Sequence, residues 1–287
     1  MKVFAMIFLL LSCGSIDEKK APQSVKKKAT TTLQPKNKTV ERQSALAYNL
    51  NSESLKGKTR FYRETYDSLT SIPNSSDEIS TKLFLCRQGK VSQGILELSK
   101  VGRKYSKWPS FWNALGICYL KKNAFYEGRV FFERALSLNS SYSPAYNNLG
   151  LIATKIDYWY SAEDFFKKSI RFNPSSEVSQ FNLGRLYLAH GLGAKARSHF
   201  TKISDTQFYK AHVLKLLAIA HIQAGSYQQG VNLLKGQSGL SSEQKMFNAF
   251  ALAKLGRKAE AKALIGNMSL QKSHPSYALL QDTKRFL

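Results

Sequence analysis

The chain is dominated by an internal repeat with a period of 34 residues. Small residues, leucines and aromatic residues recur at fixed offsets within that period. A repeat of this length indicates stacked helical hairpins, because each hairpin can bury its apolar face only against its neighbours. We therefore predict an all-α solenoid of antiparallel helix pairs. Six copies, the last two shortened, span residues 75–108, 109–142, 143–176, 177–210, 211–241 and 242–270.

Small residues recur where the two helices of a copy are expected to cross. The first helices supply Gly116, Gly150, Gly184 and Ala218 at matching offsets. The returning helices supply Gly94, Gly128, Ala162, Ala196, Gly230 and Ala261. The turn inside each copy needs a residue that tolerates a left-handed backbone. Those turn positions hold Gly89, Asn123, Asp157, Gly191, Gly225 and Gly256.

Two copies carry the motif of a known repeat most clearly. Residues 112–139 read WNALGICYLKKNAFYEGRVFFERALSLN, and residues 146–174 read YNNLGLIATKIDYWYSAEDFFKKSIRFNP and end in a proline. This pattern resembles that of the tetratricopeptide repeat family. The resemblance implies a right-handed superhelix whose first helices line a concave groove, and a function in holding an extended peptide or a helix of a protein partner there.

The same resemblance assigns residues to the wall of this groove. It implies a lining made of Asn113, Lys121, Asn147, Leu151, Lys155, Phe181, Arg185, Leu188 and Lys215. Because the set mixes amides, cations and apolar side chains, we predict a partner segment that is apolar with acidic character. Asn148 and Asn182 match a common asparagine of the family, and for them a structural role is as good an interpretation as ligand contact.

A second candidate surface is the turn that holds Tyr158 and Tyr160. Trp159, between them, takes the offset at which other copies place Phe125 and Tyr227, so we expect Trp159 to be packed. The two tyrosines are additional. They either contact a protein partner, as exposed aromatic residues often do, or pack locally.

Residues 1–12 are predicted to be a cleaved secretory signal. Lys2 provides the basic start, and the apolar run Val3–Leu11 is too short to span a bilayer. The segment Leu10-Leu11-Ser12-Cys13 resembles the lipobox of bacterial lipoproteins, which implies acyl chains on Cys13 and durable membrane anchoring. Gly14 follows the cysteine, and the resemblance then favours the periplasmic side of an outer membrane. The alternative is an ordinary secreted protein in which Cys13 is incidental.

The segments that flank the repeats have different compositions. Residues 13–40 are rich in Lys, Thr, Ser and Pro and nearly lack large apolar side chains, so we predict a flexible basic tether after Cys13. Residues 41–74 are interpreted as an N-terminal helical cap. Residues 271–287 are predicted to form a C-terminal capping helix with Tyr277, Leu279 and Leu280 inward, because the end of a solenoid needs a cover.

The formal net charge of +24 lies mostly in the repeats. A basic surface of this size attracts polyanions of every kind, so binding of acidic lipids or of an anionic envelope polymer stays open as an alternative function. The charge is equally consistent with simple solubility. We do not expect nucleic acid as a partner.

The sequence holds no motif for catalysis, cofactor binding or metal binding. The histidines have no carboxylate or cysteine at a ligand-like spacing, so we expect neither an enzyme nor a metalloprotein. Cys86 and Cys118 fall in first helices of different copies at different offsets. We expect them to be two separate buried thiols, with a disulfide as the alternative in an oxidising compartment.

Lipobox, tether and repeats together resemble the pilotin lipoproteins of type IV pilus assembly, which escort a secretin subunit to the outer membrane. They also resemble envelope adaptor lipoproteins that bring murein hydrolases to their sites. The sequence therefore predicts a membrane-anchored scaffold in envelope assembly, with the pilotin as its leading specific form.

Overall fold

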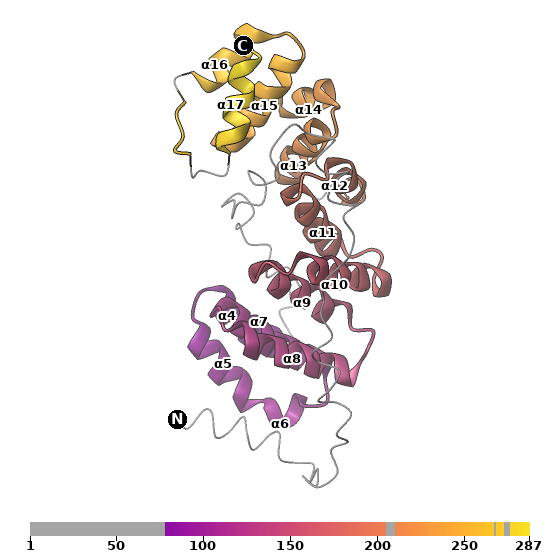
Figure 1. Cartoon of the computed structure of the whole chain (residues 1–287). Coiled ribbons are helices and arrows are strands. Elements are labelled where there is room, and N and C mark those ends of the chain that lie inside the picture. The colour runs from indigo at the N-terminus through magenta and orange to yellow at the C-terminus, as the bar shows by residue number, and fades with distance from the viewer. Residues whose placement is uncertain (1–77, 205–209, 267, 273–275) are drawn as a thin grey trace.

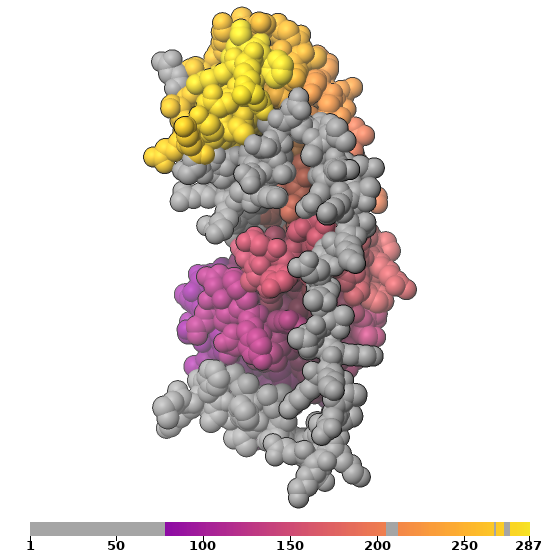
Figure 2. Space-filling view, viewed as in Figure 1, coloured from indigo at the N-terminus to yellow at the C-terminus, as the bar shows by residue number. Residues whose placement is uncertain are grey.

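The computed structural model describes residues 78–204, 210–266, 268–272 and 276–287. The predictions for the signal, Cys13, the tether and the N-terminal cap lie outside the described residues. Within them the chain forms fourteen helices and no strand, which confirms the expected all-α fold class. The hairpins follow one another along the long axis of the molecule (Figures 1 and 2).

Each repeat is a pair of neighbouring helices, and two helices stand outside this scheme. The pairs are α4 (Glu78–Arg87) with α5 (Val91–Lys100), α7 (Pro109–Lys121) with α8 (Phe125–Leu138), α9 (Ser143–Lys155) with α10 (Trp159–Phe172), α11 (Glu177–Ala189) with α12 (Gly193–Phe200), α13 (Lys210–Gln223) with α14 (Tyr227–Leu234), and α15 (Ser242–Lys254) with α16 (Lys258–Ile265). The short α6 (Gly102–Tyr105) joins the first pair to the second, and α17 (Tyr277–Arg285) packs on α15. None of the helices among the described residues has the length and apolar character that crossing a bilayer requires.

The two helices of a repeat are held together by a large side chain that lies on a glycine. A Cβ atom on Gly150 would come within 2.6–2.9 Å of three ring carbons of Phe166, which is closer than such atoms approach. Phe132 covers Gly116 and Phe200 covers Gly184 in the same way. All three phenylalanines are buried. At the equivalent offsets the last two repeats carry the smaller combinations Ala218 with Leu234 and Ala249 with Ile265.

The turn inside each repeat has the predicted left-handed backbone. Four glycines adopt it without a Cβ penalty: Gly89, Gly191, Gly225 and Gly256, with φ between 70° and 85°. Asn123 and Asp157 adopt it with φ of 61° and 60°. Short polar side chains tolerate this region best among the other residues, so the turn geometry is kept in every repeat.

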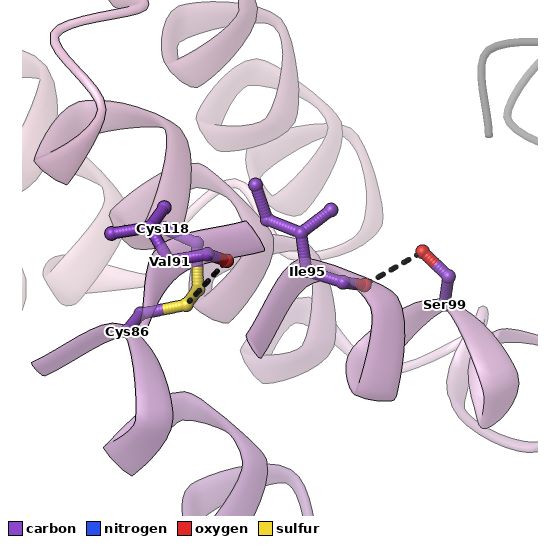
Figure 3. The surroundings of a disulfide bond; sticks show 5 residues. All are labelled: Cys86, Val91, Ile95, Ser99 and Cys118. Atoms are coloured by element: carbon purple, nitrogen blue, oxygen red, sulfur yellow. Dashed lines mark hydrogen bonds between the residues drawn. A yellow bond between two sulfur atoms is a disulfide. The ribbon is translucent and has the colours of Figure 1, made fainter. Parts of the chain in front are cut away.

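The first repeat departs from the common packing, and a disulfide bond joins it to the second. Cys86 on α4 and Cys118 on α7 are bonded, with their Cα atoms 5.3 Å apart (Figure 3). The prediction of two separate thiols was therefore wrong. Gly94 makes room for the bond, because a side chain there would collide with Sγ of Cys86. The first repeat has Lys82 at the crossing position where the next three have glycine.

The last helix covers the C-terminal end of the apolar core. Leu279 and Leu280 of α17 are buried, and Tyr277 is half-buried. Ser276, just before α17, donates a hydrogen bond to Glu243 of α15 at 2.9 Å. The apolar face of the last repeat is thus not left open to water, as a terminal helix of a solenoid requires.

Candidate partner-binding groove

The first helices of three successive repeats are linked by a row of buried asparagines. Asn182 donates from Nδ2 to Oδ1 of Asn147 at 2.9 Å, and Asn148 donates in the same way to Asn113 at 2.9 Å. A longer bond of 3.4 Å from Asn147 to Asn148 joins the two steps. All four side chains are buried. The row therefore runs in one direction from α11 through α9 to α7.

The row gives two of the predicted groove residues a structural role inside the array. Asn113 and Asn147 use their carbonyl oxygens within the array, so these atoms do not face a ligand. The row stops at Asn182, whose Oδ1 has no hydrogen-bond partner among the described residues. It stops because the fourth repeat carries Phe181 at the position of Asn147, and the fifth carries Leu216 at the position of Asn182, so neither supplies an amide to continue the row.

The asparagine row leads to a prediction about stability. Asn148→Ala should lower the free energy of unfolding by about 1–2 kcal/mol, because it leaves the buried amide oxygen of Asn113 without its donor. Chemical denaturation followed by circular dichroism measures the effect. Asn232→Ala, which removes an exposed asparagine that pairs only with Gln228, is the matched control and should change stability little. Equal effects of the two substitutions would contradict the structural role of the row.

The apolar residues predicted to line the groove lie in the core of the array. Leu151, Phe181 and Leu188 are all buried. The ring of Phe181 lies near that of Phe200, with centroids 6.1 Å apart. The carbonyl oxygen of Leu188 accepts a hydrogen bond of 3.1 Å from Gln223 on the next first helix. These three side chains thus lie in the core and do not present a surface to a partner.

The cationic residues of the predicted lining are the part that reaches the surface. Lys155 is exposed, and Lys121, Arg185 and Lys215 are half-buried. Arg185 lies over the ring of Phe181, 5.5 Å from its centroid. Lys215 donates to the carbonyl oxygen of Ser238 at 2.7 Å. The part of the predicted lining that reaches the surface is therefore cationic.

The two tyrosines of the second candidate surface are both exposed. Tyr158 is 61% exposed and Tyr160 is 40% exposed. Trp159 is half-buried and packs on the core, with its ring 4.7 Å from that of His190 in the next repeat. Tyr160 also lies against Trp159, at 3.8 Å between centroids. Tyr158 is thus the member of the pair that stands out into solvent.

The titratable groups inside the array are structural. Burial lowers the pKa of His199 to about 4, with Lys202 and Lys167 adding to the shift, so this ring is neutral at neutral pH. His199 is hydrogen-bonded through Nδ1 to Gln180 at 2.6 Å. Burial also raises the pKa of Tyr187, which donates to Glu163 at 2.8 Å. The bond between His199 and Gln180 joins the two helices of one repeat, and the bond between Tyr187 and Glu163 joins successive repeats; neither was predicted. In the described residues no group of His, Cys, Asp and Glu side chains is arranged to hold a metal ion.

Comparisons with known proteins agree with this geometry. The tetratricopeptide repeat model matches residues 109–142, which are the second repeat. PilF of Pseudomonas aeruginosa is similar in structure, with a TM-score of 0.58 and 18% identity over 72% of this chain and 95% of that one.

Other solved structures are similar at a lower score, and no curated protein matches the sequence. MamA has a TM-score of 0.45 with 19% identity, covering 64% of this chain and 98% of its own. A tetratricopeptide repeat protein of Parabacteroides merdae has a TM-score of 0.45 with 14% identity, covering 72% of this chain and 82% of its own. Together with the helix pairs described above, the likeness to PilF shows that the described part of the chain has the fold of a tetratricopeptide repeat solenoid, a fold that in other proteins serves as a scaffold for protein partners.

Proposed function

We propose that this protein is a lipid-anchored scaffold on the periplasmic face of an outer membrane, where it holds a protein partner during envelope assembly. The observation that carries the proposal is the cationic groove side of the first helices, formed by Lys155, Arg185 and Lys215. Positive charge in a peptide-binding groove favours a partner segment with acidic residues. Acyl chains on Cys13 would hold the array at the membrane.

The disulfide bond supports the compartment. Disulfides persist in oxidising compartments such as the bacterial periplasm and are rare in the cytosol. The bond between Cys86 and Cys118 agrees with export of the chain under the predicted signal. Mass spectrometry of the protein purified from membranes tests the anchor, since the mature chain should begin at an acylated Cys13. A mature chain that begins elsewhere, or an unmodified cysteine, would contradict it.

The leading specific form is a pilotin for a type IV pilus secretin. The likeness of fold to PilF, a lipoprotein related to type IV pili, supports this form. The alternative is an adaptor for a murein hydrolase. Crosslinked pull-down from membranes, with the Cys13 anchor intact, separates the two. A captured secretin supports the pilotin, and a captured hydrolase without a secretin reverses the order.

Charge reversal in the groove tests the binding site. The triple change Lys155→Glu, Arg185→Glu and Lys215→Glu should weaken partner capture at least tenfold, because each new carboxylate repels an acidic partner segment. The control reverses three exposed lysines of the last repeats: Lys235, Lys258 and Lys262. It changes the net charge equally and should leave capture unchanged. Equal capture by both triple variants would count against the groove.

A further inference from the structure

The edge of the array where hairpins begin and end carries exposed apolar side chains. First helices start there and second helices end there, as the 3.0 Å bond from Ser143 of α9 to Ser169 of α10 shows. Trp108, just before α7, is 55% exposed. Phe172 and Leu138, at the ends of α10 and α8, are 41% and 36% exposed. Leu138 and Phe172 take the same position in successive hairpins, and Trp108 lies in the junction before them. Exposed large apolar side chains that gather on one edge indicate an interaction surface.

Cations surround these apolar side chains. Arg103, Lys107, Arg134 and Arg171 are all exposed, and no carboxylate of the described residues pairs with them. Arg171 lies over the ring of Phe172 at 5.9 Å, and Arg134 lies over the ring of Trp112 at 5.7 Å. We call these four cations, together with Trp108, Leu138 and Phe172, the open edge.

The carboxylates near the open edge are already neutralised or bonded. Glu78 accepts from Lys104 at 3.0 Å and from Tyr105 at 2.8 Å, and these bonds lower its pKa. Glu133 accepts from Arg129 at 2.6 Å on the adjoining turn of α8. Glu177 accepts from the backbone nitrogen of Ser204 at 2.9 Å. The open edge therefore presents a surplus of positive charge and fits an anionic partner.

The chain enters the described structure at this same edge. Glu78 begins α4, and its bonds to Lys104 and Tyr105 place that start beside α6. Figure 1 shows α6 after α5, at the bottom of the coloured part of the array. Glu78, the first described residue, therefore lies on the edge that carries Arg103, Lys107 and Trp108.

We propose that the open edge docks on an anionic lipid surface. Trp lies preferentially at the interface of membrane and water, where its ring is amphipathic. Arg and Lys next to it bind anionic headgroups while their aliphatic stems cover apolar surface. The array then lies with its helix ends toward the bilayer. This inference goes beyond the proposed scaffold function, because the contact needs no acyl chain and leaves the groove free for a protein.

A lipid surface explains the open edge better than a protein does. The exposed side chains sit at helix ends and loops of three successive junctions, from residues 103–108 through 134–138 to 171–172. A protein partner would have to supply a separate pocket for each apolar anchor, since anchors at protein interfaces fill pockets. A lipid interface accepts all of them at once, with anionic headgroups around each.

The experiment uses the full chain with Cys13→Ser, so that no acyl chain contributes. Hydrogen–deuterium exchange is measured with neutral phosphatidylcholine vesicles and with vesicles that also contain phosphatidylglycerol. We expect slower exchange at residues 102–110, 137–143 and 171–176 with the anionic vesicles only. The turns around Lys122 and Tyr158, at the opposite edge, should not change. Protection of that opposite edge instead, or no protection at all, would overturn the proposal.

Two double substitutions test which side chains contribute to the affinity for anionic vesicles. Trp108→Ser with Phe172→Ser should weaken binding to the anionic vesicles about tenfold, and so should Arg103→Gln with Lys107→Gln. The controls are Tyr126→Ser with Tyr158→Ser, which are 77% and 61% exposed at the opposite edge, and Lys122→Gln with Lys258→Gln. Equal binding of test and control variants overturns the proposal. Loss of a captured protein with unchanged vesicle binding also overturns it, because the edge would then be a protein contact. Failure of acylation at Cys13 contradicts only the proposed anchor.

Discussion

Replacing Cys86 and Cys118 together by alanine is expected to lower the free energy of unfolding of the first hairpins by about 3–4 kcal/mol. The bond joins residues that are 32 apart in the sequence. Closing a loop of that length lowers the entropy of the unfolded chain and so stabilises the fold by about 3–4 kcal/mol. The effect is large here because the first repeat lacks the common packing. It has Lys82 and Leu98 at the positions that Gly116 and Phe132 occupy in the second repeat.

Two measurements check this prediction. Hydrogen exchange reports the local stability of α4 and α5, and a denaturation curve reports the stability of the whole array. In a solenoid each repeat contacts only its neighbours, so the loss should be concentrated in the first two repeats. A reducing agent should bring the native protein to the stability of the double variant and leave the variant unchanged. Undiminished protection of α4 in the double variant would show that packing alone holds the first repeat.

The disulfide also shows where sequence reasoning stopped. In a solenoid the first helices of successive repeats lie side by side, so residues separated by about one period become neighbours. Asn113 and Asn148 are 35 residues apart, and the two cysteines are 32 apart. The two cysteines take different offsets within their repeats. This difference argues against a bond only if residues at identical offsets are assumed to be the neighbours. A tolerance of one helical turn around the period would have found the bond, because one turn spans about 3.6 residues.

The repeat itself could be predicted because it depends on local chemistry. Small residues at crossing points and left-handed residues in turns follow from sterics at single positions, and Gly150, Asn123 and Asp157 have the predicted roles. The groove lining could not be predicted in the same way. A step of one residue turns a side chain by about 100° around a helix, so Phe181 and Asn147 point into the array although Arg185 reaches the surface.

The open edge was missed for a related reason. In the sequence, Tyr158 and Tyr160 stand out as an aromatic pair, and they belong to a turn inside a repeat. Trp108 and Phe172 belong to the junctions between repeats, and they are far apart in the sequence. Only the stacking of hairpins brings those junctions to one edge. The signal that was present is the cationic segment around Trp108, with Arg103, Lys104 and Lys107 within a few residues.

Gly150→Ala is expected to cost about 2 kcal/mol net, and Phe166→Leu in the same chain should recover most of it. Overpacking against the Phe166 ring costs about 3 kcal/mol at the upper end of its usual range, while alanine favours the helix over glycine by about 1 kcal/mol. Leucine removes the ring carbons that lie 2.6–2.9 Å from the new Cβ. The pair then matches Ala218 with Leu234, the combination that the fifth repeat already uses.

A double-mutant cycle measures this coupling and separates it from general destabilisation. The cycle for Gly150→Ala with Phe166→Leu should give a favourable interaction of about 2–3 kcal/mol, since the two residues touch. The matched control combines Phe166→Leu with Gly184→Ala, whose ring partner is Phe200 rather than Phe166. That control should be additive within about 0.5 kcal/mol. A similar interaction in both cycles would mean that repeats tolerate any smaller core, and that the match of glycine with phenylalanine does not fix the crossing of the two helices.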